Sequence, residues 1–264
     1  MSVIPLIPVH ESILCSYDVA GKTGGPRTNL RPLSKLGKAG IATPYMAGQL
    51  KRLNDAVLAA GGDFRVTECH RDIEVQKAAR AKYDRWVAAG KPASGTAGFD
   101  AKTMKAAFVA TPGRSGHNAG ISIDVHVGML KFPNVAANRQ LDRLWEIAIP
   151  LGWTPVIKAP DESASESWHF DCWGDLAPAK SRVGYEQAAL CGAILVGHGD
   201  LRGYEAEIQA LLVRAGYDIG AIDGVAGTKT RAALSDALGR TGVDALIAAK
   251  DERVISTLLA LPIR

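Results

Sequence analysis

The chain has 264 residues, of which 47% are hydrophobic and 22% are charged, and its formal net charge is +4. This length and composition are typical of a globular protein with one large or two ordinary domains. No run of eighteen apolar residues is present, which argues against a membrane-spanning helix. The N-terminus lacks the basic start and long apolar core of a secretory signal peptide, so we expect no export by that route.

The charge of the N-terminal segment bears on the expected partners, and the spacing of the cysteines bears on the state of their thiols. Residues 1–52 hold seven Lys/Arg against two Asp/Glu, a balance suited either to an anionic polymer or to an ordinary solvated surface. No interleaving of Arg with aromatic residues and no helix-turn-helix pattern accompanies this segment, so we expect no nucleic-acid partner. The four cysteines, at positions 15, 69, 172 and 191, contain no CxxC pair and predict free thiols.

The predicted elements follow a Pro- and Gly-rich segment, residues 1–42, that we expect to be extended or loop structure wrapped on the domain. Thr43 and Pro44 predict a helix start, as an N-cap and a first helical residue. In chain order, the pattern then predicts a helix ending at Gly61, a strand over 64–69, a helix over 72–89, a long loop over 91–114, a strand over 121–125, a helix over 138–149, and strands over 153–157 and 168–173. This order indicates an α+β domain with a small antiparallel sheet.

The composition changes over residues 174–184, which are predicted to be a linker. The remainder of the chain is mostly helical by its apolar pattern. We therefore expect a catalytic domain over residues 1–180 and a small all-α domain of three helices over residues 184–264.

Two separated segments carry residues that suit a metal. His117 and Asp124 lie seven positions apart, and His169 lies far along the chain. A hydrolytic zinc site takes three ligands of the His, Asp or Glu kind and leaves a fourth position for water. Glu166, three residues before His169, is available as the base that takes the proton from that water. Gly120, between the first two ligands, permits a tight turn.

Strand geometry leaves two points open. Side chains alternate along a strand, so His126 shares a face with Asp124 and is a rival ligand, while Asp171 shares a face with His169 and could orient its ring. Glu166 and His169 would point to opposite faces of a regular strand. Glu166 must therefore lie in the loop before the strand, or the chain must bend at Ser167.

The order Ser-x-His-x-x-Gly-x-x-x-Asp, then Glu-x-Trp-His, resembles the D-alanyl-D-alanine carboxypeptidase family of zinc peptidases, which includes VanY-like carboxypeptidases and phage L-alanyl-D-glutamate endopeptidases. The resemblance implies that one Zn²⁺ per chain is bound by His117, Asp124 and His169, with Glu166 as the catalytic base. It further implies that Arg71, which precedes Gln76 as in the family, holds substrate or stabilises the oxyanion. Ser115 is expected to assist by hydrogen bonding. Position 122 departs from the family pattern, with Ser where Ala is usual.

The C-terminal third carries a second resemblance. Gln209 with neighbouring leucines, then Gly216-Tyr217, then Asp-Gly-x-x-Gly-x-x-Thr from residue 223 to 230, resembles the three-helix peptidoglycan-binding domain. The two resemblances together imply a modular phage endolysin whose partner is bacterial peptidoglycan. A wall-binding module would raise the effective concentration of the enzyme at an insoluble polymer.

The implied reaction is hydrolysis of an amide in the wall stem peptide, most simply at an L-Ala–D-Glu bond. The alternatives are a carboxypeptidase that trims terminal D-Ala and a non-catalytic wall-binding protein that retains an enzyme fold. We expect a monomer that is made in the cytoplasm without a signal peptide and acts on the wall after release.

Overall fold

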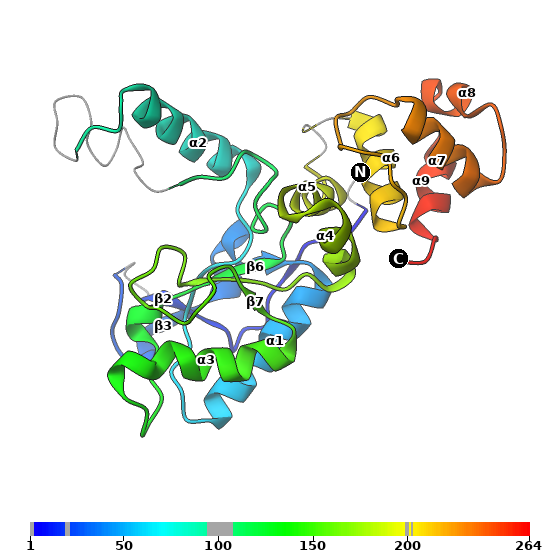
Figure 1. The fold of residues 1–264 in the computed structure, drawn as a ribbon. Helices are drawn as coiled ribbons and strands as arrows, with labels where there is room; N and C mark the ends of the chain where they lie inside the picture. The colour runs from blue at the N-terminus through cyan, green and yellow to red at the C-terminus, as the bar shows by residue number, and fades with distance from the viewer. Residues whose placement is uncertain (1–2, 19–21, 94–107, 199–200, 202) are drawn as a thin grey trace.

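The computed structural model describes residues 3–18, 22–93, 108–198, 201 and 203–264. Its centre is a six-stranded sheet in the order β3-β2-β5-β6-β8-β7 (Figure 1). The strands are β2 (Leu14–Asp18), β3 (Leu30–Pro32), β5 (Val66–Glu68), β6 (Ser122–Val125), β7 (Thr154–Pro155) and β8 (His169–Asp171). A separate two-stranded sheet pairs β1 (Ile7–Pro8) with β4 (Ile41–Ala42).

The expected antiparallel sheet is in fact mixed. β2 pairs with β5 in parallel, with Cys15 opposite Val66, whereas the other neighbouring pairs in this sheet are antiparallel. The difference arises at the N-terminus, because residues 1–42, expected to wrap the domain as loops, contribute two strands to the sheet. Of the expected loop over 91–114, residues 94–107 lie outside the described residues.

Two helices cover one face of the sheet. α1 (Pro44–Ala59) begins as predicted, with the Thr43 side chain accepting from the Met46 amide and proline at the first position. α1 packs against α3 (Gln140–Ala148), and both bury apolar residues in one core with the sheet. α2 (Ile73–Ala88), capped by Asp72, extends away from the sheet (Figure 1).

The predicted linker over 174–184 is wrong, because this segment is helical. A 3-10 turn over Gly174–Leu176 leads into α4 (Ala177–Val183), and α5 (Tyr185–Leu195) follows at once. Leu176 and Ala179 are buried, which a solvated linker would not allow. Pro178 does not break α4 because it lies in the first turn, where the missing amide has no partner to lose.

The remaining helices are α6 (Gly203–Arg214), α7 (Thr228–Leu238), α8 (Val243–Ala248) and α9 (Glu252–Leu259). α4 and α5 lie between them and the sheet (Figure 1), and the hydrophobic core of this region also contains Ala119 and Ile121. The C-terminal helices therefore share a core with the turn that carries His117. The division at residues 180 and 184 stays a prediction.

Gln209 explains the spacing of the C-terminal motif. Its side chain is 1% exposed. Its Oε1 accepts from the amides of Asp223 and Gly224, at 3.1 and 2.8 Å. Its Nε2 donates to Asp223 Oδ1, the Val225 carbonyl and Thr230 Oγ1, at 2.9, 3.1 and 3.3 Å. One buried amide thus joins α6 to residues 223–225 and to the first turn of α7. Among the described residues, no helix is long and apolar enough to cross a membrane.

Candidate metal centre and active-site cleft

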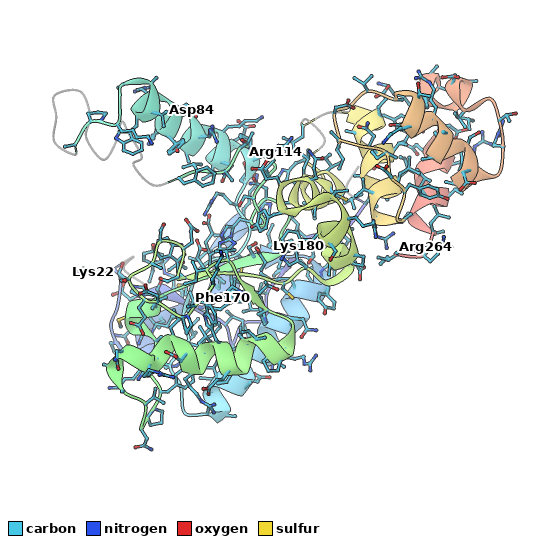
Figure 2. All side chains as sticks on the ribbon, viewed as in Figure 1. Lys22, Asp84, Arg114, Phe170, Lys180 and Arg264 are labelled. Atoms are coloured by element: carbon cyan, nitrogen blue, oxygen red, sulfur yellow. The ribbon has the colours of Figure 1, made fainter. Side chains whose placement is uncertain are left out.

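The pairing of β6 with β8 brings together residues that are far apart in sequence. Asp124 lies directly opposite His169, and Ser122 directly opposite Asp171. Side chains alternate along each strand, so Ile123 and Phe170 face the opposite side, where both are buried in one core with residues of α1 and α3. Phe170 is labelled in Figure 2. One face of this strand pair is therefore apolar and packed, and the other carries the polar site.

The third residue, His117, sits in a tight turn before β6. Ser115 Oγ accepts from the His117 amide at 3.3 Å, and the Gly120 amide bonds to the His117 carbonyl at 3.2 Å. Gly120 has a φ of +66°, as the predicted tight turn requires, and its carbonyl accepts from the Thr43 amide at the start of α1. The turn is thereby anchored to the helix layer.

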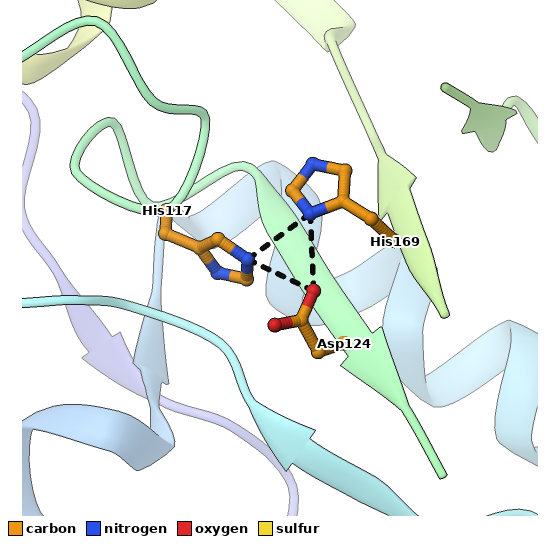
Figure 3. Close-up of side chains that lie close together, drawn as sticks. All are labelled: His117, Asp124 and His169. Carbon is orange, nitrogen blue, oxygen red and sulfur yellow. Dashed lines mark hydrogen bonds and ion pairs between the residues drawn. The ribbon is translucent and has the colours of Figure 1, made fainter. Parts of the chain in front are cut away.

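His117, Asp124 and His169 converge on one point (Figure 3). His117 Nε2 lies 3.0 Å from Asp124 Oδ1 and 3.2 Å from His169 Nδ1, and the last two atoms are 3.0 Å apart. Three ligand atoms at the corners of a tetrahedron with bonds of about 2.1 Å would be about 3.4 Å apart. The observed triangle is close to that size, so the three side chains fit a metal ion.

The outer nitrogens of both rings support the same arrangement. His117 Nδ1 donates to the Cys69 carbonyl at 2.5 Å, and His169 Nε2 donates to Asp171 Oδ1 at 3.0 Å. Each hydrogen bond places a proton on the nitrogen that faces away from the triangle. The inner nitrogens are then lone-pair donors, which is the form that binds a metal.

The charges around the triangle favour a cation. Burial alone would lower the pKa of His169, but its bonds to Asp124 and Asp171 outweigh burial and raise that pKa to about 10. The neighbouring imidazoles hold the pKa of Asp124 well below its usual range despite its burial. The site therefore attracts positive charge, which either protons or a metal ion can supply.

The structure answers the two open points of strand geometry. His126 follows the end of β6 and is not in the group of donor atoms formed by the described residues, so it is not a third imidazole of the triangle. Asp171 is the partner that orients His169. Glu166 lies in the turn before β8 with a φ of +68°, and its carbonyl accepts from the His169 amide at 3.0 Å. Of the two alternatives, the structure therefore has Glu166 in the turn before the strand.

Arg71, three residues after the end of β5, contacts the same centre. Its guanidinium makes a close ion pair with Glu68 at 2.5 Å, donates to Gln76 at 3.1 Å and lies 3.8 Å from Asp124 Oδ2. Its backbone amide donates to the His117 carbonyl, and its carbonyl accepts from Asn118 Nδ2 at 2.7 Å. Arg71 is thus part of the site wall rather than of an isolated surface ion pair.

All six predicted site residues line one open cleft of about 480 Å³. Phe108, Thr154, Pro155, Val156 and Trp168 add apolar and polar surface, and Arg114, Lys180, Asp171 and Tyr185 add charge and hydrogen-bonding groups. Cys69 and Cys172, which flank the motifs, are buried and do not line the cleft. All four cysteines are free thiols, as predicted.

The sequence analysis did not identify several residues of the site. Asn118, fully buried, joins the ligand turn to Arg71 and to the Gly113 amide. Ser122, noted only as a departure from the family pattern, donates to Asp171 Oδ1 at 2.5 Å. Lys180 and Tyr185 come from α4 and α5, beyond the recognisable motifs. Their place in the cleft depends on helix packing, for which local sequence offers no signal.

Comparison with known proteins agrees with the site geometry. Residues 41–175, just over half of the chain, match the model of the VanY D-alanyl-D-alanine carboxypeptidase family. No curated protein sequence matches the chain. Among solved structures, the LdcB LD-carboxypeptidase is similar at 18% identity and a TM-score of 0.36, over 51% of this chain. The chain spans 60% of the length of that protein. The extent of the family match and the His-Asp-His group within it show that this chain belongs to the VanY family of metallopeptidases.

Proposed function

We propose that the chain is a zinc-dependent carboxypeptidase that removes a terminal D-amino acid from peptidoglycan stem peptides. The observation that carries the proposal is the triangle of His117, Asp124 and His169 at the floor of an open cleft that Glu166 also lines. The family to which the chain belongs supports the reaction class and the substrate.

The chemistry divides between the metal and the chain. A zinc ion held by His117, Asp124 and His169 would polarise the scissile carbonyl and lower the pKa of a bound water to about 7. Glu166 takes the proton of the attacking water and passes it to the nitrogen of the leaving amine. Arg71 and Ser115 offer N–H and O–H donors to the oxygen that becomes negative as the carbonyl is attacked.

The cations at the cleft support removal of a terminal residue. A carboxypeptidase must bind the free carboxylate of its substrate. Lys180 lines the cleft, with its ammonium 4.8 Å from the centre of the Trp173 ring. Arg114 also lines the cleft, and within the described part of the chain its ion pair is with the exposed Glu186 at 3.2 Å.

Cleavage of an internal bond, such as L-Ala–D-Glu, is the second candidate. A further groove lies beyond the metal triangle, and Asp124 and Trp168 line both hollows. Such continuity suits a peptide that extends on both sides of the scissile bond. In this case the protein would act as an endolysin, made in the cytoplasm and released to the wall.

Mass spectrometry of digested peptidoglycan decides between the candidates. Loss of one C-terminal residue supports a carboxypeptidase, and new N-termini within the stem support an endopeptidase. Lys180→Met should raise KM for a stem peptide with a free C-terminus more than for its amidated form, whereas Lys158→Met, at an exposed position, should change neither. Equal effects on both peptides would remove Lys180 from carboxylate binding.

Glu166→Gln tests the chemistry. It should retain zinc at one ion per chain and lose about 10²–10⁴-fold in kcat, the range typical of a lost general base. Glu146→Gln, at an exposed position of α3 outside both hollows, is the control and should retain full activity. An active Glu166→Gln enzyme, or a wild-type enzyme that is fully active after chelation, would exclude the proposed mechanism.

The C-terminal helices are proposed to bind the wall. The support is the motif from Gln209 to Thr230, whose loop the structure holds in one conformation through a buried amide. The inactive Glu166→Gln protein should sediment with insoluble peptidoglycan, because it retains this region and cannot degrade the polymer. Recovery of the protein in the supernatant at every wall concentration would refute wall binding.

A further inference from the structure

Asp171 is a buried carboxylate on which three donors converge. It is 1% exposed. Its Oδ1 accepts from Ser122 Oγ at 2.5 Å, from His169 Nε2 at 3.0 Å and from Tyr185 Oη at 3.3 Å. Burial of a carboxylate is unfavourable in free energy unless the group is hydrogen-bonded, and these three donors stabilise the negative charge on Asp171 Oδ1. His169 is the only one of the three that is also in the metal triangle.

Tyr185 reaches this carboxylate from a helix outside the matched family segment. It is the first residue of α5, ten positions beyond residue 175, where the family match ends. Its ring packs edge-on against the buried Trp173, with centroids 5.0 Å apart and an interplanar angle of 81°. The ring is thus held by apolar packing, and only its hydroxyl enters the polar site.

The position of α5 is itself set by the ligand turn. A Cβ added to Gly192 would lie 2.7 Å from Ala119 Cβ and 2.7 Å from Leu176 Cδ1. The absence of a side chain at Gly192 therefore lets α5 approach the turn two residues from His117. Interiors packed this closely resist small displacements. The distance between Tyr185 and Asp171 is consequently coupled to the geometry of the ligand turn.

We propose that Tyr185 is a positioning residue for the metal centre, acting through Asp171 on the ring of His169. Tyr185 Oη donates to Asp171 Oδ1, the same oxygen accepts from His169 Nε2, and His169 Nδ1 faces the metal. Burial and the charge of Asp171 raise the pKa of Tyr185 well above its usual range, so the phenol remains a donor at every working pH. α5, which lies beyond the matched family segment, therefore helps to build the catalytic centre.

This inference rests on the proposed zinc function, and zinc affinity tests it without relying on turnover. Tyr185→Phe keeps the ring on Trp173 and removes only the hydroxyl. Loss of a hydrogen-bond partner behind a metal ligand typically lowers metal affinity by about 10–100-fold, and we expect about 10-fold here because the bond is long and one step removed. The measurement is competition for zinc with a chelator of known affinity. kcat should fall with KM nearly unchanged.

The matched control is Tyr204→Phe. Tyr204 Oη donates to the Asp251 carbonyl at 2.7 Å within the C-terminal helices, away from the cleft. It loses a phenol hydrogen bond of the same kind, so its stability should fall while its zinc affinity stays at the wild-type value. Equal weakening of zinc binding in both variants would mean that Tyr185 acts only through general stability, and would overturn the proposal.

A double-mutant cycle tests the route through Asp171. In an Asp171→Asn background, Tyr185→Phe should weaken zinc binding by much less than 10-fold, because the acceptor it acts through has changed. An undiminished effect, or wild-type affinity in Tyr185→Phe itself, would overturn the proposal. If Tyr185→Phe does not fold, 3-fluorotyrosine at position 185, a stronger donor, should tighten zinc binding, and unchanged affinity would again overturn it. A wild-type protein that binds no zinc would instead refute the proposed function.

Discussion

Lowering the pH should destabilise the protein through a buried histidine pair outside the active site. His70 is 3% exposed, its Nε2 lies 3.1 Å from His198 Nε2, and the two rings are stacked with centroids 5.3 Å apart. Two such nitrogens can share one proton but not two. Burial, and then His198, lower the pKa of His70 to about 4. A hydrogen bond to the Lys38 backbone and the charge of Asp72 oppose this shift, and the charge of Lys38 adds to it.

The sign and the size follow from this pKa. The unfolded chain binds a proton at His70 near pH 6.5, whereas the folded protein binds it only near pH 4. Stability from His70 is therefore fully present above pH 6.5 and is lost as the pH falls from 6.5 through 4. The difference of about 2.5 pKa units, at 1.36 kcal/mol each, is about 3 kcal/mol.

Urea unfolding followed by circular dichroism between pH 7.5 and 4 measures this loss. His70→Gln keeps a side-chain amide near His198 but cannot titrate, and His10→Gln, at an exposed position, is the control. The metal centre is common to all three proteins, so its own pH dependence cancels in the differences. Wild type should lose about 3 kcal/mol more than His70→Gln over this range. A difference that does not change with pH would refute the reasoning.

Three further predictions concern packing away from the metal. Gln209→Ala removes a buried amide that bonds to residues 223–225 and to Thr230, and it should lower the free energy of unfolding by about 2–4 kcal/mol in urea titration. Gln187→Ala, which accepts one bond from Ile222, should lower it by about 1 kcal/mol. A fragment that ends at Val183 lacks the helices that cover Ala119 and Ile121 of the ligand turn. It should therefore bind a hydrophobic dye and lose near-ultraviolet dichroism. Near-full cleavage of soluble peptide by this fragment would contradict the shared core. The four buried thiols should be inert to a disulfide reagent in the native protein and should all react in denaturant. Burial blocks access to the reagent, and it raises the pKa of Cys172 and of Cys191 to about 12. Rapid labelling of the native protein would contradict this burial.

The sequence by itself determined the features that depend on local chemistry. Thr43 and Pro44 specify the start of α1 because capping and proline geometry act within one turn. The metal group could be proposed because few residue types bind zinc, and the resemblance to the family pattern selected His117 over the rival His126. The position of Glu166 in the turn before β8 was one of the two alternatives that strand alternation left, since a regular strand would point Glu166 and His169 in opposite directions.

Tertiary structure alone decided what depends on neighbours distant in the chain. The parallel pairing of β2 with β5 joins residues 15 and 66, and no local pattern specifies which strands will meet. Residues 174–184 have the composition of a linker, yet they are helical because Leu176 and Ala179 gain burial against α5 and the ligand turn. Tyr185 and Asp171 meet for the same reason. Side-chain contacts across helices and strands are selected by the burial of whole surfaces, and that free energy is not contained in any short stretch of sequence.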